Sequence, residues 1–246
     1  MTHLPTTAIT TAATHLALAG QWPAATALLN ATTPETPDEH AVLALARAEV
    51  AVDWDFGRGT DYASGAIAGV PGGSWELELL RFRKDYSVVL FQGGDRKLKE
   101  RARALIDTAP DGGRLAAAHF WVGAMADNVD EEPVEACVHY RIALELAEEC
   151  GDELLMAQAL RHLGHHAHAA GDLALARSQW ERSTELLQKA GHLRPALAQQ
   201  ACLALLLRDE GDLAGARALA SETNRWARQL GIPFIVQQTA ELMESA

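Results

Sequence analysis

An internal repeat with a period of forty residues is the strongest constraint on what this chain can fold into. The segment GDLALAR at Gly171–Arg177 returns as GDLAGAR at Gly211–Arg217. A second marker keeps the same phase, because a glycine follows a run rich in Glu, Leu and Ala at Gly151, Gly191 and Gly231. Such a fixed period is typical of architectures in which one supersecondary unit is stacked repeatedly on its neighbours.

The spacing of apolar residues inside one period predicts two helices joined by a tight turn. In the second half of the period the packing positions advance by three or four residues: Leu173, Ala176, Trp180, Ser183 and Leu187. This is the stripe of an amphipathic helix. Asp172 stands where a helix N-terminus favours a side-chain oxygen, and Gly191 where a helix end favours a left-handed residue. The preceding segment, about 153–169, carries a helical stripe of its own.

The first half of the chain shows no clear repeat, but segments rich in proline or glycine divide it into helix pairs as well. A proline-rich segment at 32–37 and a glycine-rich segment at 69–73 read as loops. Helix pairs are therefore expected at residues 6–31, 38–68 and 74–108.

The packing residues of the period resemble those of the tetratricopeptide repeat (TPR) family. The resemblance rests on small and large residues at that family's spacing: Leu163, Gly164, Ala167, Gly171, Ala176 and Trp180. A forty-residue period is longer than the family's usual repeat, and it looks like the long repeats attached to bacterial signal-transduction regulators. The resemblance covers about 112–246 well and the preceding part weakly.

The fold that this resemblance implies is all-α: an α-α superhelix, or solenoid, of about five to six helix pairs. A C-terminal capping helix is expected at about 232–245. We expect a single solenoid domain over residues 1–246, with degenerate repeats in 1–110 and clearer repeats in 112–246. Each pair would bury its apolar stripe only by stacking on its neighbours.

Composition excludes several classes of partner. The chain has 246 residues, of which 48% are hydrophobic, so it can form a packed core, but no apolar run approaches the ~18 residues of a membrane span. The net charge of −12 argues against nucleic-acid and anionic-membrane partners. The three cysteines lack CxxC spacing, and no Lys or Arg precedes Arg47. We therefore expect a cytoplasmic protein without disulfides or a secretory signal.

Catalytic signatures are absent from the sequence. It contains no GxxxxGK[ST], HExxH or GxSxG motif, and no GxGxxG that follows a strand. We therefore expect no enzymatic activity and no cofactor. The aromatic residues Tyr140, Trp180 and Trp226 fall on packing stripes, so they are interpreted as core.

The histidines are the most unusual local feature, because four of the ten lie within Arg161–His168. If Leu163 and Ala167 face a neighbouring helix, Arg161, His165 and His168 lie ~100° round the helix, with His162 near them. In the family resembled, that side of each first helix lines a concave groove. A shift of forty residues either way adds positions of the adjoining repeats. The predicted ligand-binding groove residues are Trp121, Met125, Arg161, His162, His165, His168 and Arg208. They suit a peptide with apolar anchors and acidic groups.

Three interpretations of the histidine row stay open at this point. The residues can be ordinary polar side chains, they can bind a ligand in a pH-sensitive manner, or they can hold a metal. The spacing of His162 with His166, or of His165 with His168, offers two nitrogens, and Cys202 could add a thiolate. No fourth ligand is evident, so no metal site is assigned.

The function favoured by the sequence is a non-enzymatic protein- or peptide-binding scaffold or adaptor with a regulatory role. The apolar end helix could instead pack on a second copy and give a homodimer. One alternative is a metal-dependent hydrolase that uses the His162–His168 cluster. Another is a detached sensor domain of a transcription regulator, which would need a DNA-binding partner because no recognition helix with a basic face is evident.

Overall fold

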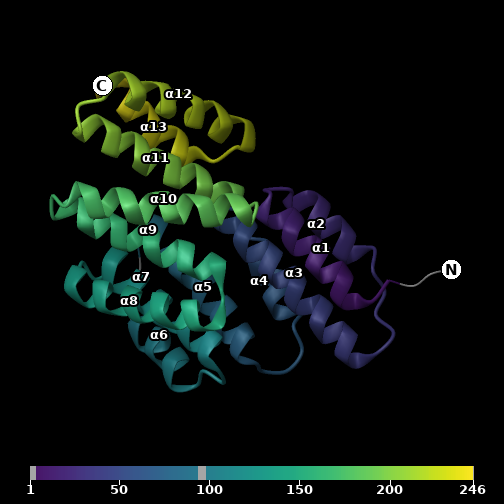
Figure 1. The fold of residues 1–246 in the computed structure, drawn as a ribbon. Helices are drawn as coiled ribbons and strands as arrows, with labels where there is room; N and C mark the ends of the chain where they lie inside the picture. Colours follow the sequence, from purple (N-terminus) through teal and green to yellow (C-terminus); the bar gives the residue numbers. More distant parts are fainter. Residues whose placement is uncertain (1–3, 94–97, 246) are drawn as a thin grey trace. The chain divides into compact units, whose positions relative to one another are not determined.

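The protein consists of helices and short connections in the part that the computed structural model describes, residues 4–93 and 98–245 (Figure 1). Thirteen α-helices follow one another in these ranges, without a strand. The all-α prediction is therefore confirmed. Contacts within the chain divide it into two compact units, residues 1–108 and 109–246. The expectation of one continuous solenoid domain over residues 1–246 stays a prediction.

The first unit consists of six helices. They are α1 (Thr6–Leu18), α2 (Trp22–Asn30), α3 (Pro37–Arg58), α4 (Ala63–Ala68), α5 (Trp75–Gln92) and α6 (Leu98–Asp107). The breaks before α3 and α5 fall at the proline-rich and glycine-rich segments. Each helix packs on the next, and the long α3 also packs on α1 and α5. Helix α3 is therefore the centre of this unit.

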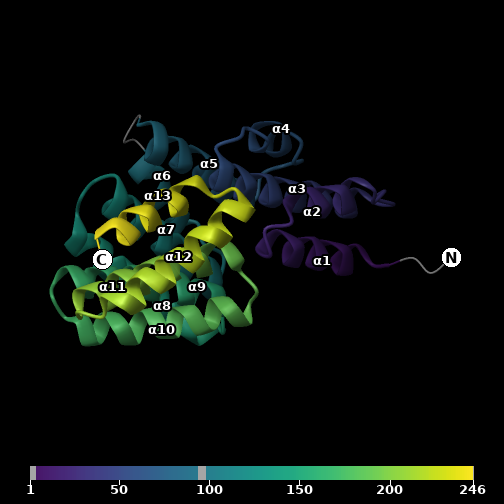
Figure 2. The same ribbon diagram turned by 90° about the horizontal axis from the view of Figure 1, so that it is seen from above.

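The second unit consists of three helix pairs and a final single helix. They are α7 (Gly112–Asn128), α8 (Pro133–Cys150), α9 (Glu153–Ala169), α10 (Leu173–Lys189), α11 (Leu193–Asp209), α12 (Leu213–Leu230) and α13 (Pro233–Ser245). Besides each helix packing on the next, α7 contacts α9, α9 contacts α11 and α11 contacts α13 (Figures 1 and 2). The first helices of successive pairs therefore adjoin, which is the geometry of stacked helical hairpins. The capping helix lies where it was predicted.

The Gly-Asp marker of the sequence repeat is a turn that ends one helix and begins the next. Gly171 and Gly211 have φ angles of 81° and 91°, which glycine adopts without steric cost. The carboxylates of the following Asp172 and Asp212 accept hydrogen bonds of 3.0 and 2.9 Å from backbone amides in the first turn of the next helix. The forty-residue repeat in the sequence thus corresponds to the same type of turn, formed twice.

Two of the three aromatic residues assigned to the core are buried. Tyr140 and Trp180 are fully buried, whereas Trp226 is 40% exposed, so the prediction that it packs in the core is wrong. The buried stripe of α12 runs through Ala220, Thr223 and Ala227, and Trp226 lies ~100° from it. Its indole Nε1 instead donates to the Glu222 carboxylate at 2.7 Å.

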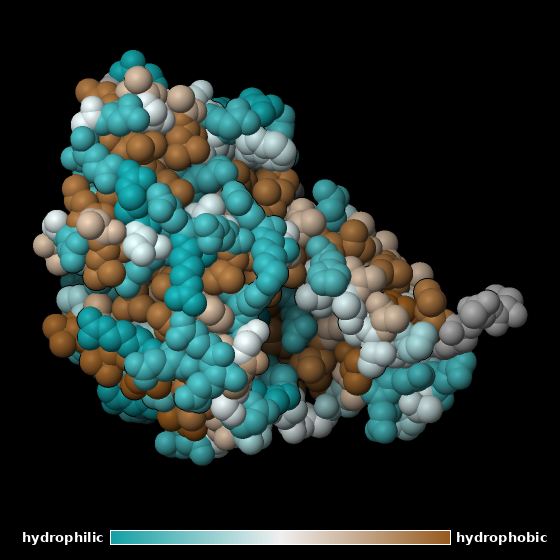
Figure 3. Space-filling view, viewed as in Figure 1, coloured by the Kyte–Doolittle hydropathy of each residue, from teal (hydrophilic) through white to brown (hydrophobic). Residues whose placement is uncertain are grey.

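Hydrophilic side chains are interspersed with apolar ones on the visible face over α10 to α13 (Figure 3). Within the described ranges, every helix is too short or too polar to cross a bilayer.

Candidate functional site

Helix α9, which carries the histidine row, packs on four other helices, α7, α8, α10 and α11. Two sides of α9 are therefore buried against different neighbours. The side chains of the row consequently separate into two groups that face different parts of the second unit. Each group forms its own contacts with an aspartate on another helix.

One group surrounds the carboxylate of Asp127 on α7. The Nδ1 atom of His162 lies 3.3 Å from Asp127 Oδ2, and the Nε2 atom of His166 lies 3.1 Å from Oδ1. The hydroxyl of Tyr140 on α8 donates to Oδ2 at 3.1 Å. The rings of Tyr140 and His162 stack with their centroids 4.6 Å apart. Asp127 thus links three successive helices through their side chains.

The protonation of this group is set mainly by its burial. Burial lowers the pKa of His162 to about 4, against the opposing effect of the Asp127 carboxylate. Burial also raises the pKa of Asp127, but the hydrogen bonds from His162 and Tyr140 outweigh it and hold that pKa below its usual value. At neutral pH the pair is therefore a neutral imidazole that donates to an ionised carboxylate. This arrangement stabilises the packing of α9 on α7 and α8.

The other group joins α9 to α11. The Nε2 atom of His168 lies 2.8 Å from Asp209 Oδ2, and the His168 ring stacks on Trp180 with centroids 5.4 Å apart. The Nη2 atom of Arg208 lies 2.9 Å from Asp209 Oδ1. Burial raises the pKa of Asp209, but its hydrogen bonds with Arg208 and His168 hold it below its usual value. His165, between the two groups, has an exposed side chain.

Arg161 differs from the other cations of this surface. Its side chain is half-buried beside Cys202, yet its guanidinium forms no ion pair with any residue in the described ranges. Its Nε is buried without a hydrogen-bond acceptor. The thiol of Cys202 is neutral at physiological pH because burial raises its pKa. Arg161 is therefore a positioned cation that lacks an anion.

The remaining predicted residues, Trp121 and Met125, lie on α7. Trp121 is half-buried, and its ring lies nearly perpendicular to that of Phe120 at a centroid distance of 5.4 Å, whereas Met125 is fully buried. Six of the seven predicted groove residues are thus at least partly accessible: Trp121, Arg161, His162, His165, His168 and Arg208. Met125 is engaged in packing, and the half-buried His162 is already engaged with Asp127 and Tyr140. The ligand-binding role of the set stays a prediction.

A second histidine contact was not anticipated from the sequence. His119 on α7 and His139 on α8 lie with their Nδ1 atoms 2.9 Å apart. Burial, followed by the charge of His139, lowers the pKa of His119. The two residues stand twenty positions apart on helices that were predicted to pair, which is the one signal that could have indicated the contact.

Metal-ligating residues are not gathered in the part of the chain that the structure describes. No group of three or more His, Cys, Asp or Glu there is arranged to hold an ion. The His162 and His166 rings face Asp127, whereas His168 turns to Asp209 on another helix. Nothing in this arrangement favours the metal-dependent hydrolase alternative.

Comparison with known proteins supports the fold alone. No protein-family model matches the chain, and no curated protein matches it. A similar solved structure is described as the crystal structure of a Rap protein complexed with Competence and Sporulation Factor. The two chains share 12% identity and a TM-score of 0.51, over 95% of this chain and 79% of the other. This chain therefore has a TPR-like helical-repeat fold.

Proposed function

We propose that this chain is a non-enzymatic TPR-like scaffold that binds a protein or peptide partner with acidic groups. The binding surface is the face of the second unit that carries the partly accessible predicted residues of α7, α9 and α11. The similar solved structure is of a complex, which supports binding as the function. Membership of the TPR family and a cytoplasmic, regulatory role are parts of the same proposal.

The observation that carries this proposal is the Arg161 guanidinium, which hydrogen-bonds the neutral Cys202 thiol but has no carboxylate partner among the described residues. A half-buried cation without a counter-ion is unfavourable, because it loses part of its hydration and gains no carboxylate in return. A carboxylate from a partner would supply that missing interaction with the fork geometry that arginine favours. Arg161 is therefore the expected centre of recognition.

The neighbours of Arg161 extend the surface in two directions. Towards α11, His168 and Arg208 share one carboxylate, Asp209, so this end carries an excess of donors. Towards α7, the half-buried Trp121 offers an aromatic face for an apolar anchor. A segment with an acidic residue next to an apolar one fits this order of side chains.

The test is affinity capture with charge-reversal variants, followed by direct titration. Wild-type protein, Arg161→Glu and His165→Glu would be used as baits, and captured partners identified by mass spectrometry. Arg217→Glu is the matched control, because it makes the same change of charge at an exposed position of α12. The leading partner would then be purified and its Kd measured for each variant.

The expected result is a partner that is retained by wild type and Arg217→Glu and lost with Arg161→Glu. Retention of the same partners by Arg161→Glu would count against this surface. Light scattering on the purified protein tests the further possibility that a second copy is the partner. In that case a dimer would form through α13, whose Phe234 and Val236 are only partly buried.

A further inference from the structure

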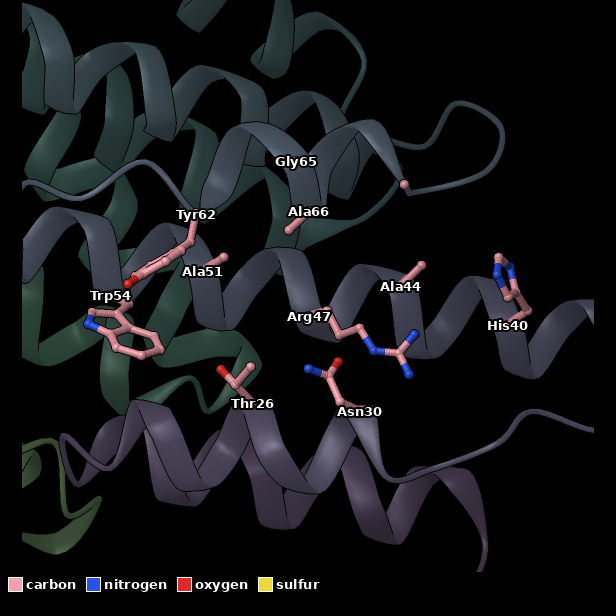
Figure 4. Close-up of a pocket in the computed structure, with 11 residues that line it drawn as sticks. Thr26, Asn30, His40, Ala44, Arg47, Ala51, Trp54, Tyr62, Gly65 and Ala66 are labelled. Carbon is pink, nitrogen blue, oxygen red and sulfur yellow. The ribbon is translucent and has the colours of Figure 1, made fainter.

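The first unit contains a cavity of about 540 Å³ that lies between α2, α3 and α4 (Figure 4). Its walls come from elements of that unit alone, so it is separate from the surface of the second unit. Small residues leave the space open, among them Ala51 of α3 and Gly65 of α4. The cavity is large enough for a small organic ligand or the end of a peptide.

Arg47 of α3 gives this cavity its charge. Its Nη2 donates to the carbonyl oxygen of Leu29 at 2.6 Å, near the end of α2, and lies 3.5 Å from that of Thr32. These carbonyls fix the position of the guanidinium but do not neutralise it. Its Nε is buried without an acceptor, and the guanidinium has no ion pair with any described residue. Arg47 therefore presents an uncompensated positive charge at the cavity wall.

The composition of the walls departs from that of the surrounding sequence. Residues 1–80 contain nine acidic residues and only two basic ones, Arg47 and Arg58. None of the residues lining the cavity is acidic. The amide of Asn30, on α2, is directed towards Arg47 across the cavity (Figure 4). An anion bound there would face the hydrogen-bond donors of Arg47 and Asn30. It would not be repelled by a carboxylate, because no lining residue is acidic.

The other end of the cavity is aromatic. The rings of Trp54 and Tyr62 contact each other with a centroid distance of 4.8 Å, and they lie at the opposite end from His40, with Arg47 between them (Figure 4). The Trp54 ring also stacks on the ring of the buried Trp22, with their centroids 6.5 Å apart. Trp22 is itself fixed by a 2.8 Å hydrogen bond to Asp53. The aromatic wall is thus preorganised for an apolar group.

We propose that this cavity binds an apolar carboxylate. The carboxylate group would accept hydrogen bonds from Arg47 and Asn30, and the apolar body would lie against Trp54 and Tyr62. Such a group occurs both in free organic acids and at the C-terminus of a peptide that ends in an apolar residue. The inference does not depend on the function proposed for the second unit.

The experiment is isothermal titration of the full chain with matched acids and amides. The probes are 3-phenylpropionate, its primary amide, the tripeptide Gly-Gly-Phe and the same tripeptide with an amidated C-terminus. We expect the acids to bind at least about tenfold more tightly than the amides, because only they supply the anion for Arg47. Tighter binding of Gly-Gly-Phe than of 3-phenylpropionate would identify a peptide end as the source, and the reverse a free acid.

Two variants assign the binding to the cavity. In Gly65→Leu the new Cβ meets no atom within 4 Å, so the side chain can fill the space without disturbing the helix. Ala68→Leu is the control, at an exposed position of the same helix outside the lining. Arg47→Gln removes the charge, and circular dichroism would show whether that variant folds.

Loss of binding in Gly65→Leu, with wild-type affinity in Ala68→Leu, is the expected result. If Arg47→Gln does not fold, Gly65→Leu and the acid–amide comparison still decide the question. The proposal is overturned if the acids do not bind at millimolar concentration, if acids and amides bind equally, or if Gly65→Leu retains wild-type affinity.

Discussion

The indole of Trp180 on α10 lies so close to Gly164 on α9 that no other residue fits at position 164. A Cβ added to Gly164 would lie 2.4 Å from Cδ1 and 2.5 Å from Nε1 of the ring. Trp180 is fully buried, and its Nε1 donates to the carbonyl oxygen of Arg161 at 2.9 Å. The ring is therefore fixed and cannot move aside without breaking this bond. The close approach of the two helices depends on the missing side chain.

Substitution Gly164→Ala should consequently destabilise the protein. Alanine favours an isolated helix by about 1 kcal/mol over glycine, but overpacking against Trp180 should cost about 3 kcal/mol, so we expect a net loss of about 2 kcal/mol. Urea denaturation followed by circular dichroism would measure the change. Gly113→Ala on α7 is the control, because its Cβ would meet only Asp111 Oδ1, at an ordinary 3.6 Å. Equal stability of Gly164→Ala and wild type would contradict the assignment.

The helix boundaries could be predicted because their causes are local. The turn that Gly171 and Asp172 form needs only a positive φ and an N-cap, and both are visible in the sequence. The forty-residue period then places the same turn at Gly211 and Asp212. Boundaries of this kind do not depend on which helices lie beside one another.

The contacts of the histidine side chains could not be predicted, because they depend on which helices lie next to α9. The apolar stripe of Leu163 and Ala167 identifies one buried side of that helix. A helix inside a stack also packs on the preceding pair, so His162 and His166 turn to Asp127 rather than to a ligand. A polar residue on such a second buried side looks like a surface residue in the sequence.

The cavity of the first unit was missed for a related reason. It exists because small residues on α3 and α4 come together, and their spacing in the sequence shows no pattern. One signal was present, since Arg47 is the first Lys or Arg of the chain and stands within an apolar helical stretch. A lone arginine among alanines indicates a cation that needs a partner.

The stability of the fold should fall in mild acid because His162 is neutral in the folded state. Its folded pKa is about 4 and its ordinary value is 6.5, so between these pH values the unfolded chain binds a proton that the folded chain excludes. This difference should remove about 3 kcal/mol as the pH falls from about 6.5 to about 4, with little further change from this group below. Urea midpoints measured from pH 8 to pH 4 would follow the loss.

The variant His162→Gln separates this contribution from others. At pH 8 it should be less stable than wild type, since the stacking on Tyr140 is lost. Its slope with pH should be shallower, although not flat, because burial also lowers the pKa of His119. Curves that run parallel for the variant and wild type would mean that His162 does not titrate as described.

The carboxylate of Asp55 should hold α4 against the end of α3. It is almost fully buried and accepts hydrogen bonds from the Thr60 hydroxyl at 2.6 Å, from the Tyr62 amide at 3.0 Å and from the Ala63 amide at 2.8 Å. Asp55→Ala leaves these donors unsatisfied, so we expect a loss of about 2–4 kcal/mol. Thermal denaturation checks this value. Asp61→Ala is the control, because Asp61 is exposed and accepts a hydrogen bond from the nearby Ser64 hydroxyl. An equal effect of both substitutions would contradict the role of Asp55.

The capping helix should be secured by one buried amide. Asn224 of α12 donates through Nδ2 to the Val236 carbonyl at 2.8 Å and to the Thr239 hydroxyl at 2.9 Å, and its Oδ1 accepts from Arg228 at 2.7 Å. Asn224→Ala should cost about 1–3 kcal/mol and weaken the attachment of α13 more than that of α11. Amide hydrogen exchange read by mass spectrometry would show faster exchange in residues 233–245, with the peptides of α9 unchanged.

Arg228→Ala should have a smaller effect, because the two bonds from Asn224 to α13 remain. Uniform acceleration across the second unit in Asn224→Ala would instead show that this amide supports the whole unit.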